Sequence, residues 1–447
     1  MENNYTYLKL IQSQNLTFWD VKSYNQQDIA SQYKVEKLQN LLIEHTKKVK
    51  LFEKPEDDFK ILGVNNQEGL FDAYIEKGKN INQPYKKVEN GYFAYNPYRI
   101  NVGSIGLKSD KQKYDYISPA YVVFSCKNDL YPQYLEILLK TKYFAQAIRH
   151  NTTGSVRQTL GFDNLCNISI PLPSVEKQKE LVSEYEHLQN LATQKEEDAK
   201  KIENSIDEYL LSELGVKNVS SLRNERNLFK IIQYNALNKW EIDRIYQLEA
   251  KYPIVSFGNN PNIVQSIKRG KSPHYSEQSN CLAINQKCVR KQYIDMTYAR
   301  KIEQIWCDEI DTEYKTKEDD ILINSTGEGT IGRAAIVNKE TNYIYDSHIL
   351  NVRLNKEECF PHYFLRLFNT ELLQKQVDLY KSGTSTKQTE LGVDNLKKIS
   401  FPLPSMEIQR SIIMEIENKE KQIIIIRNES EQLKQQAVSN FEQEVFN

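Results

Sequence analysis

A stretch of 18 residues occurs twice in this chain of 447 residues, and the repeat limits the folds that the chain can adopt. The first copy covers residues 161–178, and the second covers residues 392–409, 231 positions later without a gap. The positions that recur include Asp163, Asn164, Leu165, Ile168, Ser169, Pro171, Leu172, Pro173, Ser174, Glu176 and Gln178. A repeat of this length predicts two similar halves arranged in tandem.

Each copy leads directly into a long charged segment with apolar residues at heptad spacing. Ser174 is a candidate N-cap, and Gly215 is a candidate stop, so residues 174–213 are predicted to form one helix. Residues 405–446 repeat the heptad positions of the first segment, with Lys195 as the break in the first stripe. One stripe alone is also typical of core packing, but two stripes in the same register favour antiparallel pairing as a coiled coil.

The predicted helices would each be roughly 50 Å long at ~1.5 Å per residue. Antiparallel pairing would place the two globular blocks at opposite ends, related by a pseudo-twofold axis. The residues expected to pair the helices are Leu181, Tyr185, Leu188, Ile202, Ile206, Ile412, Ile416, Ile423, Ile426 and Leu433.

The rest of the chain indicates two α/β blocks built on one plan. We place the first block at residues 1–172, the first long helix at 173–214, the second block at 215–403 and the second helix at 404–447. In the first block, spacing predicts helices at 35–51 and 132–149 and strands at 60–64, 91–95 and 120–125. In the second, it predicts a strand at 320–324 and a helix from 361 to about 380. Entry segments at 15–24 and 238–243 echo each other, whereas the middles of the blocks differ.

The charge distribution separates the helices from the blocks. Residues 174–213 carry 11 Asp and Glu against 5 Lys, and residues 405–446 carry 8 Glu against 5 Lys and Arg. The chain has a net charge of −1, so the remaining residues carry a net of +8. Basic blocks beside acidic helices fit a nucleic-acid partner better than the overall charge suggests.

The composition excludes several classes of protein. No run approaches the ~18 apolar residues of a membrane helix, and residues 1–7 lack the pattern of a signal peptide. The six cysteines form no C-x-x-C pair, so neither zinc nor a disulfide framework is indicated. We therefore expect no metal, no membrane and a cytoplasmic location.

Basic residues interleaved with tyrosines are the strongest sign of a binding surface. Residues 265–301 carry eight Lys and Arg against two acids, with three tyrosines between them. Such a patch neutralises phosphates while Arg, Asn and Gln read base edges, although an ordinary solvated face has the same composition. The loops at 154–159 and 383–389 each hold a cation and an amide, which would either contact phosphate or tie the block to its helix. The DNA-binding candidates are Tyr95, Asn96, Tyr98, Arg99, Lys108, Arg157, Gln158, Lys268, Arg269, Lys271, Ser272, Arg290, Lys291, Arg333, Lys387 and Gln388.

Catalytic motifs are weak by comparison. Residues 327–332 match G-x-G-x-x-G, but residues 333–337 read as a strand and not as the required helix, so a turn between strands is the better interpretation. Residues 269–272 lack the first glycine of a P-loop. Residues 96–98 lie one proline short of an adenine-methyltransferase motif, with no cofactor-binding turn before them. No catalytic residue is assigned, and we expect no enzyme activity in this chain.

Together these features resemble the specificity subunits of type I restriction–modification systems. The resemblance rests on residues 172–178 and 403–409, each closing a block and opening a long helix, on the turn at 267–273 and on the turn at 330–333. It covers essentially the whole chain, although the first block lacks a counterpart of the Gly-Lys-Ser-Pro turn. It implies two α/β target-recognition domains joined by two antiparallel helices.

The resemblance also implies partners and no catalysis. A non-catalytic specificity subunit would bind double-stranded DNA at a bipartite, asymmetric site, dock two methyltransferase subunits and join a restriction and translocase subunit. No cofactor is expected in this chain, and S-adenosylmethionine would belong to the methyltransferase. Three alternatives remain: a specificity subunit of a bipartite type IIB-like system, a coiled-coil scaffold with no DNA role, and a stand-alone methyltransferase.

Overall fold

The computed structural model describes residues 29–100, 103–152, 159–216, 248–338, 342–383 and 389–446. The chain folds into two compact units, Met1–Glu197 with Arg427–Asn447, and Asp198–Ile426. Each unit takes part of both long helices, so the four boundaries drawn from the sequence stay a prediction. The entry segments at 15–24 and 238–243 lie outside the described residues. None of the described helices is long and apolar enough to cross a membrane.

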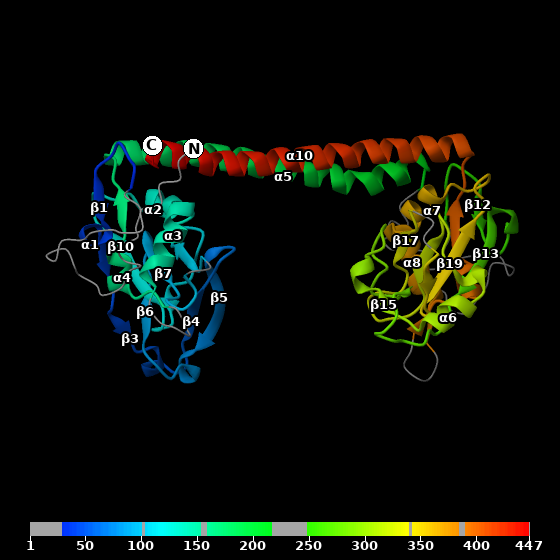
Figure 1. The fold of residues 1–447 in the computed structure, drawn as a ribbon, viewed down its shortest axis with the longest axis horizontal. Helices are drawn as coiled ribbons and strands as arrows, with labels where there is room; N and C mark the ends of the chain where they lie inside the picture. The colour runs from blue at the N-terminus through cyan, green and yellow to red at the C-terminus, as the bar shows by residue number, and fades with distance from the viewer. Residues whose placement is uncertain are drawn as a thin grey trace, which may run out of the picture. The chain divides into compact units, whose positions relative to one another are not determined.

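The first unit contains a four-stranded antiparallel sheet in the order β2-β10-β7-β8 (Figure 1). Its strands are β2 (Leu42–Glu44), β10 (Val122–Cys126), β7 (Tyr92–Tyr95) and β8 (Ile105–Leu107). Side chains alternate between the two faces of a strand. Phe93 and Phe124 therefore pack on one face against α2 (Pro132–Leu138), α3 (Lys142–Asn151) and α4 (Phe162–Cys166). Ala94 and Val123 pack on the other face.

A second sheet of the first unit has the order β3-β6-β9-β4-β5. Its strands are β3 (Lys48–Val49), β6 (Tyr85–Lys87), β9 (Tyr116–Ile117), β4 (Asp58–Asn65) and β5 (Gly69–Lys77). Short 3₁₀ turns at η3 (Leu51–Glu53) and η4 (Gly78–Asn80) lie beside it. Leu62, Leu70 and Ile117 join Ala94 and Val123 in one apolar cluster, so the two sheets share a core.

The second unit repeats the four-stranded antiparallel sheet in the order β13-β19-β16-β17. Its strands are β13 (Val264–Arg269), β19 (Ile349–Leu354), β16 (Ile321–Asn324) and β17 (Ala334–Ile336). Ile321 and Ile323 pack toward α7 (Pro361–Phe368) and α8 (Glu371–Tyr380), while Leu322 packs on the opposite face. Burial on both faces explains why β16 is continuously apolar.

A smaller sheet in the second unit supports the basic region found in the sequence. It has the order β15-β14-β18, from β15 (Arg300–Lys301), β14 (Leu282–Ile284) and β18 (Ile344–Tyr345). The helix α6 (Gln304–Glu309) and the 3₁₀ turns η10 (Met296–Tyr298) and η11 (Thr312–Tyr314) connect its parts, whereas η9 (Pro261–Ile263) leads into β13. Cys281 and Cys307 form a disulfide here, which the scattered cysteines did not indicate.

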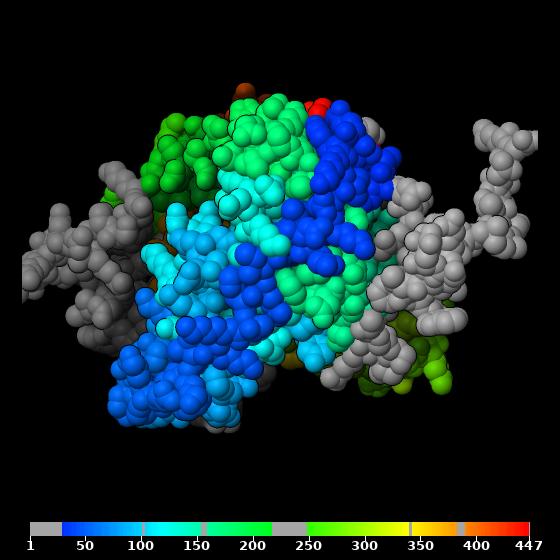
Figure 2. All heavy atoms as spheres, turned by 90° about the vertical axis from the view of Figure 1, so that its left-hand side faces the viewer, coloured from blue at the N-terminus to red at the C-terminus, as the bar shows by residue number. Residues whose placement is uncertain are grey.

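The repeated stretch forms the same junction in both units. The strand β1 (Val35–Lys37) pairs with β11 (Ser169–Pro171), and β12 (Ile254–Ser256) pairs with β22 (Ser400–Pro402). Figure 2 shows the first of these pairs on the surface of its unit, where the blue segment of β1 lies beside green residues. In the second unit, α9 (Val393–Leu396) precedes β22, and a short hairpin of β20 (Ser382–Gly383) and β21 (Thr389–Glu390) precedes α9.

The two long helices follow these junctions, at α5 (Val175–Glu213) and α10 (Met406–Phe446). Ser174 accepts a hydrogen bond from the Lys177 amide at 3.3 Å, as an N-cap does. Gly215 has φ +61°, and its amide donates to the Ser212 carbonyl, which ends the helix. The prediction of two long helices, with this start and stop for the first, is confirmed.

The helices pair inside each unit. In the first unit, Leu181 and Tyr185 pack with Phe441, and the Ser430 hydroxyl donates to the Ala192 carbonyl at 2.8 Å. In the second, Ile206 is buried in one cluster with Ile412, Ile416 and Ile423, and Ile202 and Ile426 are partly buried against it. Leu188 and Leu433 are half-buried. Lys195, the break in the stripe, forms an ion pair with Glu429.

Three predicted helices are wrong in detail. Residues 35–51 form β1, a one-turn helix α1 (Leu38–Leu41), β2, β3 and η3, because pairing with β11 and β10 overrides local spacing. Residues 132–149 form two helices, since Thr141 starts α3 by accepting from the Phe144 amide at 3.3 Å. The predicted helix at 361–380 is also divided, at Thr370, whose hydroxyl donates to the Leu367 carbonyl at 2.6 Å.

Candidate nucleic-acid interface

The basic region of the second unit begins where β13 ends. Arg269 is the last residue of that strand, and the Gly270 amide donates to the Ile349 carbonyl of β19 at 3.0 Å. A β-carbon at Gly270 would lie 2.2 Å from the Asp346 carbonyl oxygen. Only glycine therefore fits this turn, and the tight turn brings Lys271 and Ser272 to the surface.

Three cations of this region lie over the rings of three tyrosines. The Lys271 ammonium is 4.2 Å from the centre of the Tyr314 ring. Arg290 lies 4.6 Å from the Tyr298 ring, and Arg300 lies 3.7 Å from the Tyr275 ring. We call these six residues the cation–aromatic surface: Lys271, Tyr275, Arg290, Tyr298, Arg300 and Tyr314. Such stacking holds each charged group in place before a ligand arrives.

This surface presents both charge and aromatic area to solvent. Tyr275 and Tyr298 are 42% and 45% exposed, and Tyr293 beside them is 56% exposed. Partial burial raises the pKa of Tyr275, so its hydroxyl stays protonated at neutral pH. Arg290 and Tyr314 are half-buried, and the other four residues are exposed. Cations stacked on such rings can pair with phosphate while the rings contact sugars or bases.

Two of the predicted cations are already paired with carboxylates. Lys268 forms an ion pair with Glu313, and Arg269 forms one with Glu390. Arg269 also donates through Nε to the Ser347 carbonyl at 2.6 Å. The hydrogen bond from Lys268 lowers the pKa of the Glu313 carboxyl below its usual range. These two cations have less free charge to offer a phosphate than Lys271, Arg290 and Arg300.

The other predicted residues of the second unit have different environments. Ser272 lies 2.9 Å from the Ser347 hydroxyl, and Lys291 is exposed. Arg333 donates to the Gly329 carbonyl at 3.0 Å, so it closes the turn that carries it. That turn joins β16 to β17 as an antiparallel hairpin, with Gly327, Gly329 and Gly332 at φ between +71° and +101°. The interpretation of residues 327–332 as a turn between strands is confirmed.

Two predicted residues of the first unit are buried and do not form a surface. Tyr95 is completely buried, and its hydroxyl donates to the Leu160 carbonyl at 3.1 Å. Lys108 is 4% exposed, and its ammonium donates to the Val88 carbonyl and to Asp115 at 2.9 and 2.6 Å. Both residues stabilise the unit's interior, which corrects the expectation that they contact DNA.

The neighbouring residues of the same stretch do reach the surface. Tyr98 is 60% exposed and Arg99 is exposed. The Asn96 side chain accepts from the Tyr98 amide at 3.0 Å, which makes a turn that projects the next residues. Arg157, Gln158, Lys387 and Gln388 lie outside the described residues, so their part in a surface stays a prediction.

The side chains that contact these cations could not be identified from the sequence. Tyr314, Glu313 and Glu390 lie 43 to 121 residues from the cations they contact, in segments with no basic cluster of their own. No spacing rule connects such distant positions. Within the described part of the chain, no group of three or more His, Cys, Asp or Glu side chains is arranged to hold a metal ion.

Comparison with known proteins relates part of the chain to a family of DNA specificity domains. Residues 251–435 match the model of the type I restriction modification DNA specificity domain. A protein of Methanocaldococcus jannaschii, provisionally assigned as the type I restriction enzyme MjaX specificity subunit, is 27% identical over 154 residues. That match spans 34% of this chain and 36% of the relative's length.

One solved structure shows the same fold over nearly the whole chain. A chain from a study of complex assembly and conformational transition of the type I R-M system superposes with a TM-score of 0.60 at 14% identity. The superposition covers 94% of this chain and 98% of that one. The HsdS subunit from Thermoanaerobacter tengcongensis has a TM-score of 0.49 at 13% identity, over 95% and 99% of the two chains. The chain is thus similar to type I restriction–modification specificity subunits, through a matching domain over residues 251–435 and through one curated relative. Its mixed α/β fold is shared with a chain from a type I R-M system.

Proposed function

We propose that this chain is the subunit that reads a bipartite, asymmetric DNA site for a type I restriction–modification complex. Each unit would contact one half-site on double-stranded DNA. The two half-sites would differ, because the units share their four-stranded sheets and junctions but differ in the segments around them. The cation–aromatic surface is the observation that carries the proposal, since fixed cations over exposed rings suit a polyanionic ligand with flat bases.

The long helices support a role as a spacer. Their 39 and 41 residues correspond to rods of roughly 60 Å at ~1.5 Å per residue, which would limit the separation of the half-sites. Their excess of acidic side chains would keep them away from DNA and direct the basic blocks toward it. A matched heptad insertion in both helices should therefore lengthen the gap in the recognised site.

Partners would supply the chemistry. We assign no catalytic residue and no cofactor to this chain. Two methyltransferase subunits, carrying S-adenosylmethionine, would dock on it and modify the bases that it selects. A restriction and translocase subunit would complete the assembly. The described residues contribute hydrogen-bonding, charged and stacking groups to this scheme.

One experiment tests the proposal directly. The chain is expressed with and without the methyltransferase subunit of its own system, and modified adenines are mapped across the host DNA. A split, asymmetric motif that appears only with both proteins is the expected result. Methylation by this chain alone would support a stand-alone methyltransferase, and unmethylated DNA with both proteins would contradict the proposal.

A second measurement separates recognition from a scaffold role. The purified complex should bind DNA with an affinity that falls as salt rises, because phosphate contacts release counterions. Charge reversal at Lys271, Arg290 and Arg300 should abolish binding. A coiled-coil scaffold without a DNA role predicts no salt-dependent binding and no effect of these changes.

A further inference from the structure

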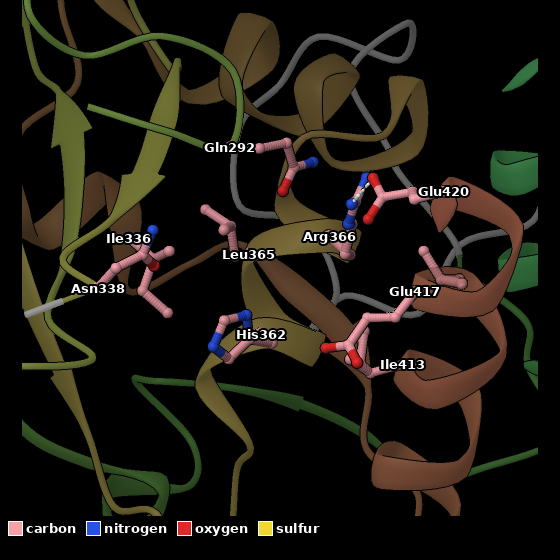
Figure 3. A pocket seen from close by; sticks show the side chains of 10 residues that line it. Gln292, Ile336, Asn338, His362, Leu365, Arg366, Ile413, Glu417 and Glu420 are labelled. Carbon is pink, nitrogen blue, oxygen red and sulfur yellow. Dashed lines mark hydrogen bonds and ion pairs between the residues drawn. The ribbon is translucent and has the colours of Figure 1, made fainter. Parts of the chain in front are cut away.

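A pocket of about 240 Å³ opens on the second unit between α7, α10 and the edge of the sheet. Figure 3 shows its walls: the side chains of α7 lie in the middle, those of α10 on one side, and Ile336 and Asn338 on the other. The floor is apolar, because Ile336, Leu365, Ile413 and Ile416 are all buried. A ligand that enters this pocket therefore needs an apolar portion.

The rim of the pocket carries more carboxylates than cations that can pair with them. Arg366 of α7 forms an ion pair with Glu420 of α10, so the charges of these two residues cancel (Figure 3). Glu417 lies one helical turn before Glu420 and is exposed. Its carboxylate has no hydrogen bond or ion pair with another side chain in the described ranges. His362 lies on the same wall, 4.0 Å from Asp319. One carboxylate of the rim is thus left unpaired.

Gln292 adds a second unpaired acceptor. The amide oxygen of its side chain is buried and has no hydrogen-bond partner in the described structure. Its backbone lies at φ +79°, a conformation that costs a non-glycine residue free energy, so surrounding contacts must hold it there. A buried acceptor without a partner is unfavourable and is usually satisfied by a bound donor.

We infer that this pocket receives the side chain of an arginine or lysine from a protein partner. The aliphatic stem of such a residue would lie on the apolar floor. Its N–H donors would meet the Glu417 carboxylate and the Gln292 amide oxygen, which are the two acceptors left open. An anionic or purely apolar group would leave both acceptors unsatisfied, so neither fits the pocket as well.

The surface beside the pocket indicates a protein and not a small amine. Met414, Ile424 and Ile425 on α10 are 60%, 59% and 55% exposed. Helical spacing places Met414 three residues before Glu417 and Ile424 seven residues after it, so these side chains adjoin the pocket along α10. Three large apolar side chains this exposed on one helix favour coverage by another protein surface.

This inference rests on the proposed function, which supplies the partner as the methyltransferase subunit. The pocket, and a basic residue of the partner that is anchored in it, go beyond that function. The anchor would be buried on binding, with its charge satisfied by Glu417, as is typical of residues that dominate an interface. Loss of one member of such a pair weakens binding strongly, because the other charge is left buried and unpaired.

The test measures binding between the purified full-length chain and the purified methyltransferase subunit by titration calorimetry. Glu417→Lys places a cation where the anchor's cation binds, so the affinity should fall at least tenfold. Glu417→Gln keeps the shape and should cause a smaller fall. Glu431→Lys changes the charge of α10 equally at an exposed position outside the pocket and should leave the affinity within twofold of the wild-type value.

A second variant separates a protein anchor from a free amine. Ile425→Glu alters the apolar strip and leaves the pocket intact, and it should also weaken the complex. The wild-type chain should bind the methyltransferase subunit. If Glu417→Lys and Ile425→Glu both bind it as tightly as the wild type, the inference is overturned and the proposed function stands. Absence of any complex with the wild-type chain would overturn the proposed partner and this inference together. Unchanged melting temperatures would show that the variants are folded.

Discussion

Gln178 and Gln409 make the same three hydrogen bonds in the two units. Each amide oxygen accepts from the backbone amide that precedes a proline-initiated helix, Tyr131 in one unit and Phe360 in the other, at 2.7 Å. Each amide nitrogen donates to two carbonyls, one of which belongs to the proline before the long helix. Both side chains are completely buried. The repeated sequence therefore encodes a junction that fixes the start of the long helix to the globular block.

Replacement of Gln409 by alanine should destabilise the second unit by about 2–3 kcal/mol. The change leaves the Phe360 amide and two carbonyls without their partner in a buried place, and unsatisfied buried groups are costly. Urea denaturation followed by circular dichroism measures the loss. Gln422→Ala, at an exposed position on the same helix, is the control and should change stability little. Equal effects of the two variants would contradict the junction's role.

Replacement of Lys195 by leucine should leave the stability unchanged or raise it slightly. Lys195 pairs with Glu429, but both side chains are more than 40% exposed, and exposed ion pairs contribute only about 0–1 kcal/mol. Leucine would restore the apolar stripe that the lysine interrupts. Thermal melting in low and high salt provides the measurement. A loss of several degrees would show that the ion pair determines helix pairing more than the stripe does.

Local patterns predicted the elements whose partners are near in sequence. The helices α5 and α10 were predictable because their heptad spacing and the Ser174 cap lie within one segment. The strands β4, β7, β10 and β16 were also predictable, as short apolar runs between turns. Residues 35–51 were not, because β1 and β2 acquire their structure from strands 80 to 136 residues away.

The candidate site was predictable only in part for the same reason. The cations of residues 265–301 were visible as a cluster in the sequence, but the carboxylates that pair with Lys268 and Arg269 come from distant segments. Lys108 appeared to be a surface lysine because its partners, the Val88 carbonyl and the half-exposed Asp115 side chain, cannot be inferred from spacing. The number of cations could be predicted from the sequence. Which of them lack a carboxylate partner could be determined only from the fold.

Arg300 should contribute more to DNA binding than its charge alone. Its guanidinium is 3.7 Å from the Tyr275 ring, and a lysine cannot reproduce that planar stack. Arg300→Ala should weaken binding about tenfold and reduce the salt dependence by about one phosphate contact. Arg300→Lys should keep the salt dependence and still bind less tightly than the wild type. Fluorescence anisotropy across a salt series measures both quantities, and identical behaviour of the two variants would contradict the role of stacking.

Glu313 should weaken DNA binding, because it forms an ion pair with Lys268. The ion pair withdraws the Lys268 charge, so Glu313→Gln should free it and tighten binding several-fold at low salt. The hydrogen bond from Lys268 lowers the pKa of Glu313 below 4.5, so the ion pair persists above that pH and is lost only as the pH falls through the lowered value. The ratio of variant to wild-type affinity should therefore stay constant between pH 6 and 8. Asp308→Asn removes an acidic charge from the nearby helix α6, away from Lys268, and should leave the affinity nearly unchanged. A variant that binds no better than the wild type would show that Lys268 does not face the DNA.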